Sequence, residues 1–206
     1  MSEAKRSGRF IVIEGGEGVG KSTQVARLAE SLRASGHDVV LTFEPGDTPA
    51  GADLRNALLH ADNALDPRAE LMLMLADRAQ HVAEVVGPAI ARGAIVVCDR
   101  YEPSSLAYQG VARGLGVDEV ERLSKWATGA LRPDAVIVLD APDEVAEARV
   151  STARDRIEHA GPEFHARVRA AYRELAPARG WVVVDADGTP DVVAARVLDA
   201  LAPVLS

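Results

Sequence analysis

The fold of this chain is decided by the stretch Gly15-Gly16-Glu17-Gly18-Val19-Gly20-Lys21-Ser22. It fits the pattern G-x-x-x-x-G-K-[ST], and it lies between an apolar run at 9–14 and a segment at 23–32 with helical spacing. In a strand, glycine-rich turn and helix start of this kind, backbone N–H groups point inward and the helix N-terminus adds positive potential. We therefore predict a phosphate-binding loop in which Lys21 reaches the β- and γ-phosphates and Ser22 holds Mg²⁺.

Alternating strands and helices follow this loop along the chain. We predict strands at 9–14, 38–43, 94–98, 134–140 and 181–185. Three of them contain continuous apolar runs, which is typical of strands buried on both faces of a parallel sheet. The pattern predicts a doubly wound α/β fold of the P-loop NTPase type, with a five-stranded parallel sheet and helices on both faces. We expect a tail at 1–8 and one domain at 9–206, with a short lid at about 150–162.

Composition limits the partners and the location of the protein. The chain has 206 residues and a formal net charge of −8, which argues against broad binding to nucleic acids or anionic membranes. The single cysteine, Cys98, excludes an internal disulfide, and its apolar strand predicts a packed, unreactive thiol. The sequence contains neither a signal peptide nor an apolar run of about 18 residues, so we predict a cytoplasmic protein.

A long helical region separates the second and third predicted strands. Asp66-Pro67 is typical of a helix start, because aspartate caps the end and proline suits the first helical position. Gly87-Pro88 predicts a kink or a restart. The segment 71–76 is apolar all round, so two faces need cover. We expect one face to pack on the sheet and the other on a second subunit, which gives a homodimer hypothesis.

The ends of the predicted strands carry polar residues. Ligands of open α/β sheets bind beyond the carboxyl ends of the strands. The second strand ends at the turn Glu44-Pro45-Gly46-Asp47-Thr48, with Arg55 following in the next helix, and the third ends at Asp99-Arg100-Tyr101. Asp99 is a candidate Mg²⁺ ligand and Arg100 a candidate anion contact, the alternative being a structural cap formed by this pair.

Glu17 lies within the phosphate loop. A carboxylate beside a triphosphate is unfavourable unless it faces a hydroxyl, a cation or Mg²⁺. Glu17 is therefore a candidate for recognising a neutral donor group on a second substrate, and solvent exposure is the alternative.

Three arginines, Arg149, Arg154 and Arg156, cluster after the fourth predicted strand. On a lid, such arginines supply charge to a moving phosphoryl group and help to exclude water. The alternative is a solvated helix face.

An ordered set of motifs resembles those of thymidylate kinases, over essentially residues 9–190. Residues 10–23 are similar to that family's phosphate loop, and Glu44-Pro45-Gly46 with Arg55 is similar to its acceptor-phosphate segment. The most specific matches are Arg78 and the run Asp99-Arg100-Tyr101-Glu102-Pro103-Ser104-Ser105-Leu106-Ala107-Tyr108-Gln109-Gly110. Asp155-Arg156-Ile157-Glu158 resembles the lid motif of the bacterial form.

The resemblance implies a nucleoside monophosphate kinase that converts MgATP and dTMP into ADP and dTDP, for dTTP synthesis. It implies that Glu17 meets the sugar 3′-hydroxyl and that Arg55 and Arg100 bind the dTMP phosphate through forked guanidinium groups. Arg78 would bind the thymine edge, and Tyr108 would disfavour ribonucleotides. Ser105 and Gln109, one helical turn apart, would line the base pocket.

The residues that the resemblance assigns fall into four groups. The acceptor-binding residues are Glu17, Glu44, Pro45, Arg55, Met74, Arg78, Arg100, Ser104, Ser105, Tyr108 and Gln109. The ATP-binding residues are Gly15, Gly16, Glu17, Gly18, Val19, Gly20, Lys21, Ser22, Thr23, Arg149 and Asp187. Ser22 and Asp99 would hold Mg²⁺. The catalytic residues are Lys21, Arg100, Arg154 and Arg156.

The chain departs from the family pattern at several positions. Phe43 stands where many members have arginine, and Met74 stands where many have a phenylalanine that stacks on the base. No basic residue lies at 16–19, so the chain resembles members that carry the catalytic arginine on the lid. Ser151 and Thr152 stand where another lid arginine is expected, which leaves Arg154 and Arg156 as alternatives for that role.

Two other functions are weighed against this one. A deoxynucleoside kinase, or another nucleoside monophosphate kinase, shares the phosphate loop, but a neutral acceptor has no need of both Arg55 and Arg100. A nucleotide-dependent switch or binding module needs a segment that senses the γ-phosphate and a partner surface, and neither is visible in the sequence.

Overall fold

The computed structural model describes residues 8–59, 64–149 and 156–205. Its strands form one sheet, and all the neighbouring pairs are parallel. The strands are β1 (Arg9–Gly15), β2 (Val39–Phe43), β3 (Ile95–Asp99), β4 (Ala135–Asp140) and β5 (Val182–Asp185). Their order in the sheet is β2-β3-β1-β4-β5. The predicted five-stranded parallel sheet is therefore confirmed, and each predicted strand lies within one residue of the observed one at either end.

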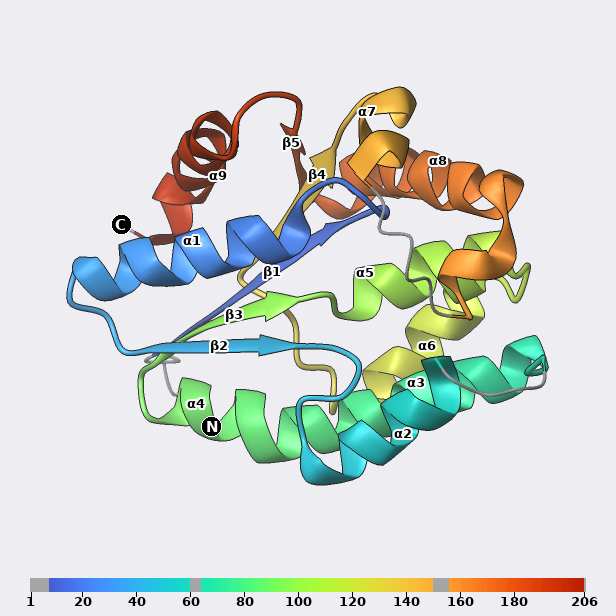
Figure 1. Cartoon of the computed structure of the whole chain (residues 1–206). Coiled ribbons are helices and arrows are strands. Elements are labelled where there is room, and N and C mark those ends of the chain that lie inside the picture. Colours follow the sequence, from blue (N-terminus) through green and yellow to red (C-terminus); the bar gives the residue numbers. More distant parts are fainter. Residues whose placement is uncertain (1–7, 60–63, 150–155, 206) are drawn as a thin grey trace.

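The central strand β1 contributes to two hydrophobic cores. Ile11 and Ile13 pack in one core with side chains of α1 (Lys21–Ala34) and α9 (Pro190–Leu205). Phe10 and Val12 pack in the other, with α4 (Gly87–Ala91) and α8 (Pro162–Arg179). All four side chains are fully buried, as expected of a strand covered on both faces. Figure 1 shows the sheet between these two sets of helices.

The strand order places the functional ends of β1 and β3 side by side. Ile13 pairs with Asp99 in the register between these strands. From β1 the chain crosses to β2 and returns to β3, and only then continues to β4 on the other side. This reversal opens a crevice beyond the carboxyl ends of β1 and β3. The phosphate loop and the Asp99-Arg100 turn therefore lie at the same place (Figure 1).

The long helical region begins where the sequence predicts and continues through the predicted break. In α3 (Pro67–His81), the Asp66 side chain caps the helix by accepting from the Arg68 N–H at 2.9 Å. A π-helix, η1 (Val82–Val86), then leads into α4. The N–H of Gly87 donates to the carbonyl of Val82, so a wide turn takes the place of a sharp kink or restart before Pro88.

The second apolar face of α3 is covered within this chain. Leu71 and Leu75 pack against Leu106 of the π-helix η2 (Leu106–Ala112) and Val120 of α6 (Val117–Ala127). On the other face, Met74 packs against the core that includes the sheet. The expectation that this second face needs another subunit is thus corrected, because α6 and η2 supply its cover. The homodimer stays a prediction.

Four further elements lie along the chain between those already described. They are α2 (Pro49–Leu59), α5 (Glu102–Ser105), α7 (Asp143–Arg149) and the short 3₁₀ helix η3 (Glu158–Ala160). Residues 150–155 of the predicted lid and 1–7 of the predicted tail lie outside the described residues. Gly8 is buried, so it belongs to the fold and not to a tail.

Two further expectations concern the core and the membrane. The Cys98 thiol is fully buried and free, as predicted. In the part of the chain that the structure describes, no helix is long and apolar enough to cross a bilayer. The cytoplasmic location stays a prediction.

Burial of α9 on the sheet is expected to contribute strongly to stability. Leu201 is fully buried in the core beside α1, whereas Leu41 on β2 is 41% exposed. We expect Leu201→Ala to lower the free energy of unfolding by about 3 kcal/mol, because it removes buried methyl groups and leaves a cavity. Leu41→Ala, the matched control, should cost less than about 1 kcal/mol. Urea denaturation followed by circular dichroism measures both, and equal losses would contradict this account of the core.

Candidate functional site

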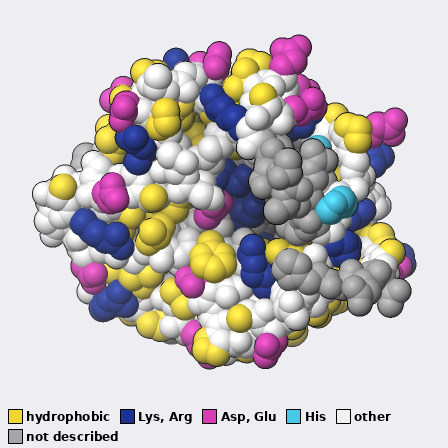
Figure 2. All heavy atoms as spheres, in the orientation of Figure 1, with side chains coloured by type: hydrophobic (Ala, Val, Ile, Leu, Met, Phe, Trp, Pro, Cys, Tyr) yellow, Lys and Arg dark blue, Asp and Glu magenta, His cyan; other side chains and the backbone are white. Residues whose placement is uncertain are grey.

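A cavity of about 580 Å³ opens at the carboxyl ends of β1, β2 and β3. Figure 2 shows a hollow near the centre of this face, with Lys and Arg side chains gathered in it. All of the predicted acceptor-binding residues line this cavity: Glu17, Glu44, Pro45, Arg55, Met74, Arg78, Arg100, Ser104, Ser105, Tyr108 and Gln109. Lys21, Ser22 and Asp99 line it as well. Residues from four separate chain segments therefore meet at one place.

The phosphate loop is built by glycines and closed by Lys21. The ammonium of Lys21 is buried and donates to the Gly16 carbonyl at 2.6 Å, so it lies inside the loop. Burial and the nearby Arg100 charge lower the pKa of Lys21, while Glu17 and Asp99 oppose the shift. The helix α1 begins directly after Gly20, and its first turn contains no acidic residue. Its N–H groups are thus suited to an anion.

The loop needs a glycine at position 18 for a reason other than phosphate binding. Its φ is +75°, and an added Cβ would lie 2.0 Å from the Ala146 carbonyl oxygen. A side chain at this position would collide with the backbone of α7. The backbone of the loop at Gly18 therefore lies close against the backbone of α7.

Ser22 and Asp99 form a pair of oxygen ligands at the mouth of the loop. The Ser22 hydroxyl donates to Asp99 Oδ2 at 3.0 Å. Asp99 Oδ1 is buried and has no hydrogen-bond partner among the described residues. Hydroxyl and carboxylate oxygens are the ligands that Mg²⁺ prefers, so this pair fits the ion. No group of three or more His, Cys, Asp or Glu side chains within the described ranges could hold a metal by itself. The remaining ligands would come from phosphate oxygens and water.

Glu17 faces a cation and a hydroxyl, as its place in the loop requires. It accepts hydrogen bonds from Arg100 Nη2 and from the Tyr108 hydroxyl, the latter at 2.9 Å. Burial alone would raise the pKa of Glu17, but the charges of Arg100 and Lys21 outweigh it and lower the pKa to about 2. The side chain is 23% exposed, which excludes the solvated alternative. Glu17 is therefore ionised at neutral pH and held at the cavity wall.

Arg100 is fixed by its backbone and by its contacts with Glu17, Ser104 and Tyr108. Its φ is +72°, which is uncommon for a residue other than glycine. Its Nη1 donates to the Ser104 hydroxyl at 3.2 Å, and its guanidinium lies over the Tyr108 ring at 5.2 Å. This geometry points the cation into the cavity beside the phosphate loop. The alternative of a simple Asp99–Arg100 cap is not what the structure contains.

Glu14 supports this arrangement, although the sequence analysis did not single it out. It is fully buried at the end of β1. Its Oε1 accepts from the N–H groups of Tyr101 and Ser104, and its Oε2 accepts from the hydroxyls of Ser104 and Tyr172. Burial raises the pKa of Glu14, and the charge of Arg100 opposes the shift. The sequence signal that could have identified Glu14 is a carboxylate at the end of an otherwise apolar strand.

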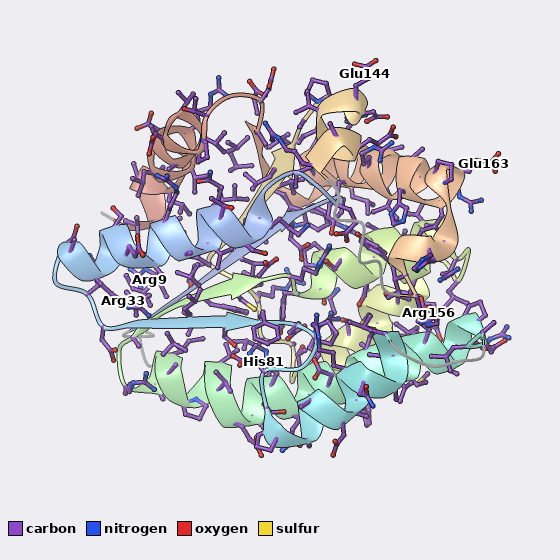
Figure 3. The ribbon with its side chains drawn as sticks, viewed as in Figure 1. Arg9, Arg33, His81, Glu144, Arg156 and Glu163 are labelled. Atoms are coloured by element: carbon purple, nitrogen blue, oxygen red, sulfur yellow. The ribbon has the colours of Figure 1, made fainter. Side chains whose placement is uncertain are left out.

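Arg78 is held on three sides at the floor of the cavity. Its Nε donates to Glu44 at 2.7 Å, its Nη1 to the Ser124 hydroxyl at 3.0 Å and its Nη2 to the Tyr101 carbonyl at 3.0 Å. The same Glu44 carboxylate lies 2.8 Å from Nδ1 of His81, a residue that sequence reasoning missed (Figure 3). The guanidinium is nearly fully buried, so its position is set before any ligand binds.

Beside Arg78, the cavity is lined by a hydroxyl without a hydrogen-bond partner among the described residues and by a second, half-buried arginine. The Ser105 hydroxyl is buried and has no hydrogen-bond partner among the described residues, although it lines the cavity. Arg55 donates to the Pro45 carbonyl at 2.6 Å, and its guanidinium lies 5.6 Å from the centre of the Phe43 ring. Phe43 therefore packs beside Arg55 at the cavity wall.

The comparisons with known proteins agree with this site. A model of the thymidylate kinase family matches residues 13–197. The chain belongs to the thymidylate kinase family. It is 51% identical over 197 residues to the thymidylate kinase of Leifsonia xyli subsp. xyli, with 93% of each chain covered. It is 48% identical over 196 residues to that of Synechococcus sp. (strain JA-2-3B'a(2-13)), with 94% of each covered. It is 47% identical over 203 residues to that of Pseudomonas fluorescens (strain Pf0-1), with 96% of each covered. The resemblance to this family is thereby confirmed.

The residues that the thymidylate kinase resemblance assigns to adenine lie outside the cavity. Arg149 donates from Nη1 to the Ala186 carbonyl at 3.2 Å, and from Nη2 to the Gly188 carbonyl at 3.5 Å. These carbonyls flank Asp187, so the structure brings Arg149 and the Asp187 loop together. Their role toward ATP stays a prediction.

Of the two candidate lid arginines, the structure describes Arg156 and not Arg154. Arg154 lies outside the described residues. Arg156 donates from Nε to the Leu58 carbonyl at 2.8 Å and from Nη2 to Glu70 at 2.8 Å. Its side chain lies beside α3, where it contacts Glu70 (Figure 3). In this structure the Arg156 guanidinium is engaged away from the phosphate loop.

Asp77 makes the stability of the protein depend on pH. Burial and the neighbouring Glu44 charge raise its pKa from 3.8 to about 6, against the opposing effects of His81, the Gly46 N–H and Arg78. Its Oδ1 accepts from the Gly46 N–H at 3.0 Å, while Oδ2 is buried and has no hydrogen-bond partner among the described residues. Because the folded state binds this proton more tightly, the free energy of unfolding should fall as pH rises from 4 to 6.

We expect Asp77→Asn to remove this fall, because asparagine does not titrate and its Oδ1 still accepts from Gly46. Relative to wild type, the variant should gain about 2 to 3 kcal/mol between pH 4 and pH 8. Denaturant titrations at both pH values measure the difference. Asp38→Asn, a surface control, should change little at either pH. If the free energies of unfolding of wild type and variant differ by the same amount at both pH values, the raised pKa of Asp77 is contradicted.

Proposed function

We propose that this protein transfers the γ-phosphoryl group of ATP to the phosphate of dTMP, giving ADP and dTDP. One observation carries the proposal: cations from separate chain segments converge on a single cavity. Lys21 lies in the phosphate loop, Arg100 lies beside that loop and pairs with Glu17, and Arg55 donates to the Pro45 carbonyl of the acceptor turn. Membership of the thymidylate kinase family supports ATP and dTMP as the two substrates.

On the donor side, the loop at 15–22 would bind the ATP phosphates through its N–H groups. Lys21, now on the Gly16 carbonyl, would turn to the β- and γ-phosphates. Ser22 and Asp99 would hold Mg²⁺, which neutralises charge on these phosphates when bound. Arg149 and the Asp187 loop would contact adenine.

On the acceptor side, Arg55 and Arg100 would bind the dTMP phosphate. Glu17 would accept from the sugar 3′-hydroxyl, with the charge of Arg100 keeping it ionised. Arg78 and Ser105 would bind the thymine edge, because each lines the cavity and Ser105 has an unused hydroxyl. Met74 would lie against the base, where a thioether suits a ring.

The reaction needs positioning and charge, and it needs no covalent intermediate on the enzyme. A phosphate oxygen of dTMP attacks the γ-phosphorus in line, and the bond to the β–γ bridging oxygen breaks. Lys21 stabilises charge on the donor side and Arg100 on the acceptor side. Arg154 is the lid residue that we propose for the moving phosphoryl group. We propose a homodimer as the assembled form, and Met72, which is 51% exposed on α3 and not part of the face that α6 and η2 cover, supports it.

The assay that tests this function measures ADP formed from ATP with a panel of acceptors. We expect dTMP to support turnover and thymidine to fail, because two cations are placed for an acceptor that carries a phosphate. Lys21→Ala should lower kcat by about 10³-fold while the thermal midpoint is retained. Wild-type turnover with thymidine but not dTMP would refute the proposal, and nucleotide binding without any turnover would favour a switch.

Ser105→Ala tests the base pocket without disturbing the fold. The hydroxyl has no hydrogen-bond partner among the described residues, so its loss should leave the thermal midpoint unchanged or slightly higher. The KM for dTMP should rise by about 5- to 10-fold, because a hydrogen bond to the base is lost. An unchanged KM with a lowered midpoint would mean that this hydroxyl serves the fold and not the ligand.

A further inference from the structure

The buried carboxylate of Glu70 gathers four donor groups from two chain segments. It lies in the first turn of α3 and is 1% exposed. Its Oε1 accepts from Gln109 Nε2 at 2.9 Å and from Arg113 Nε at 3.2 Å. Its Oε2 accepts from Arg113 Nη2 at 3.1 Å and from Arg156 Nη2 at 2.8 Å. Neither the phosphate loop nor the acceptor-phosphate turn contributes to this cluster.

The partners of Glu70 carry the wall of the cavity near Met74. Gln109 itself lines the cavity, and so does Ile157, the residue next to Arg156. The N–H of Arg156 donates to the Leu59 carbonyl at 3.1 Å, and Leu59 is another lining residue. Met74 lies one helical turn after Glu70 on α3. One carboxylate thus joins the wall pieces contributed by α2, α3, η2 and the segment at 156–157.

The charges within the cluster favour this arrangement. Burial would raise the pKa of Glu70, but the hydrogen bonds from Gln109, Arg113 and Arg156 outweigh it and lower the pKa. Arg113 is held further by the Phe164 ring, whose centre lies 4.4 Å from the guanidinium carbon. Removing Glu70 would leave two cations facing each other without their shared carboxylate, which is costly in a buried position.

The same contacts give Arg156 a defined place. Its Nε is bound by the Leu58 carbonyl and its Nη2 by Glu70, so both ends of the guanidinium face α2 and α3. To reach a phosphoryl group at Lys21, Arg156 would have to give up these contacts and its anchor on Leu59. Arg156 can therefore affect the side of the cavity where the base would bind.

We propose that Glu70 and Arg156 form a positioning pair that fixes the cavity wall receiving the dTMP base, and that Arg156 acts on acceptor binding and not on the moving phosphoryl group. This inference rests on the proposed function. It adds Glu70 to the residues that shape the acceptor pocket. It also assigns Arg156, one of the two alternatives for a catalytic arginine, to a different task.

The experiment compares Glu70→Gln, Arg156→Ala, Arg156→Lys and the double variant Glu70→Gln/Arg156→Ala. Steady-state assays give kcat and the KM values for dTMP and ATP, and calorimetry gives the Kd for dTMP in the absence of ATP. Glu121→Gln is the matched control, because Glu121 also binds two cations, Lys125 and Arg179, but does not line the cavity.

We expect each of the two single variants Glu70→Gln and Arg156→Ala to raise the KM and Kd for dTMP by about 10-fold, the effect of one charged hydrogen bond. The kcat and the KM for ATP should stay within about 3-fold of wild type, a split that general destabilisation does not produce. The double variant should lose little more than either single variant, because the two residues act through one contact. Arg156→Lys should recover part of the loss, and Glu121→Gln should change none of these values.

Several results would overturn the inference. Arg156→Ala with kcat lowered by about 10³-fold and an unchanged Kd for dTMP would give Arg156 the transition-state role instead. An unchanged Kd in a folded Glu70→Gln protein would also end it. If Glu70→Gln does not fold, the two Arg156 variants decide the question by the same KM and kcat criterion. A wild-type protein that forms no ADP with dTMP would refute the proposed function as well, and the wild-type assay separates that case from the others.

Discussion

The buried carboxylate of Glu14, at the end of β1, joins the phosphate loop to the turn that follows β3. Strand pairing alone would only bring these two segments close together. Glu14 immediately precedes the phosphate loop, and both of its oxygens bind the turn and helix that follow β3. Tyr172 of α8 completes the contact. Since a buried carboxylate is costly without such donors, the geometry of the Arg100 turn is tied to that of the loop. This contact acts together with the Ser22–Asp99 and Glu17–Arg100 hydrogen bonds, which join the same two segments.

The cavity collects positive charge in a protein whose formal net charge is −8. The arrangement is stable because two of the cations there have their own carboxylates: Glu17 for Arg100 and Glu44 for Arg78. These ion pairs hold the guanidinium groups in place before a ligand arrives, so little reorganisation is needed afterwards. The Arg55 guanidinium, by contrast, is held by a backbone carbonyl and an aromatic ring, which leaves its charge to a ligand.

Local sequence pattern predicted the elements well and their long-range partners poorly. Apolar runs located the strands, and the glycine pattern located the phosphate loop, because both signals are carried by neighbouring residues. The motif resemblance also led to the residues that line the cavity. Glu70 and Arg156 are separated by 86 residues, and Glu14 and Ser104 by 90, so no periodicity links them. His81 and Asp77 were missed for the same reason. The π-helix η2 was also not visible, since its sequence has ordinary helical composition. The cover of α3 was misjudged because the amphipathic α6, which supplies it, lies about forty residues further along the chain.

Gly18 limits where a basic side chain can be placed in the phosphate loop of this enzyme. The Ala146 carbonyl occupies the place that a side chain at position 18 would need. Evolution of this chain could not add a basic group there without moving α7, however useful such a group is to catalysis. At position 18 the phosphate loop is therefore closed by the main chain of α7, whereas an added Cβ at Gly20 would meet no atom within 4 Å. If the reaction needs one more cation, a segment other than position 18 has to supply it, as proposed for Arg154.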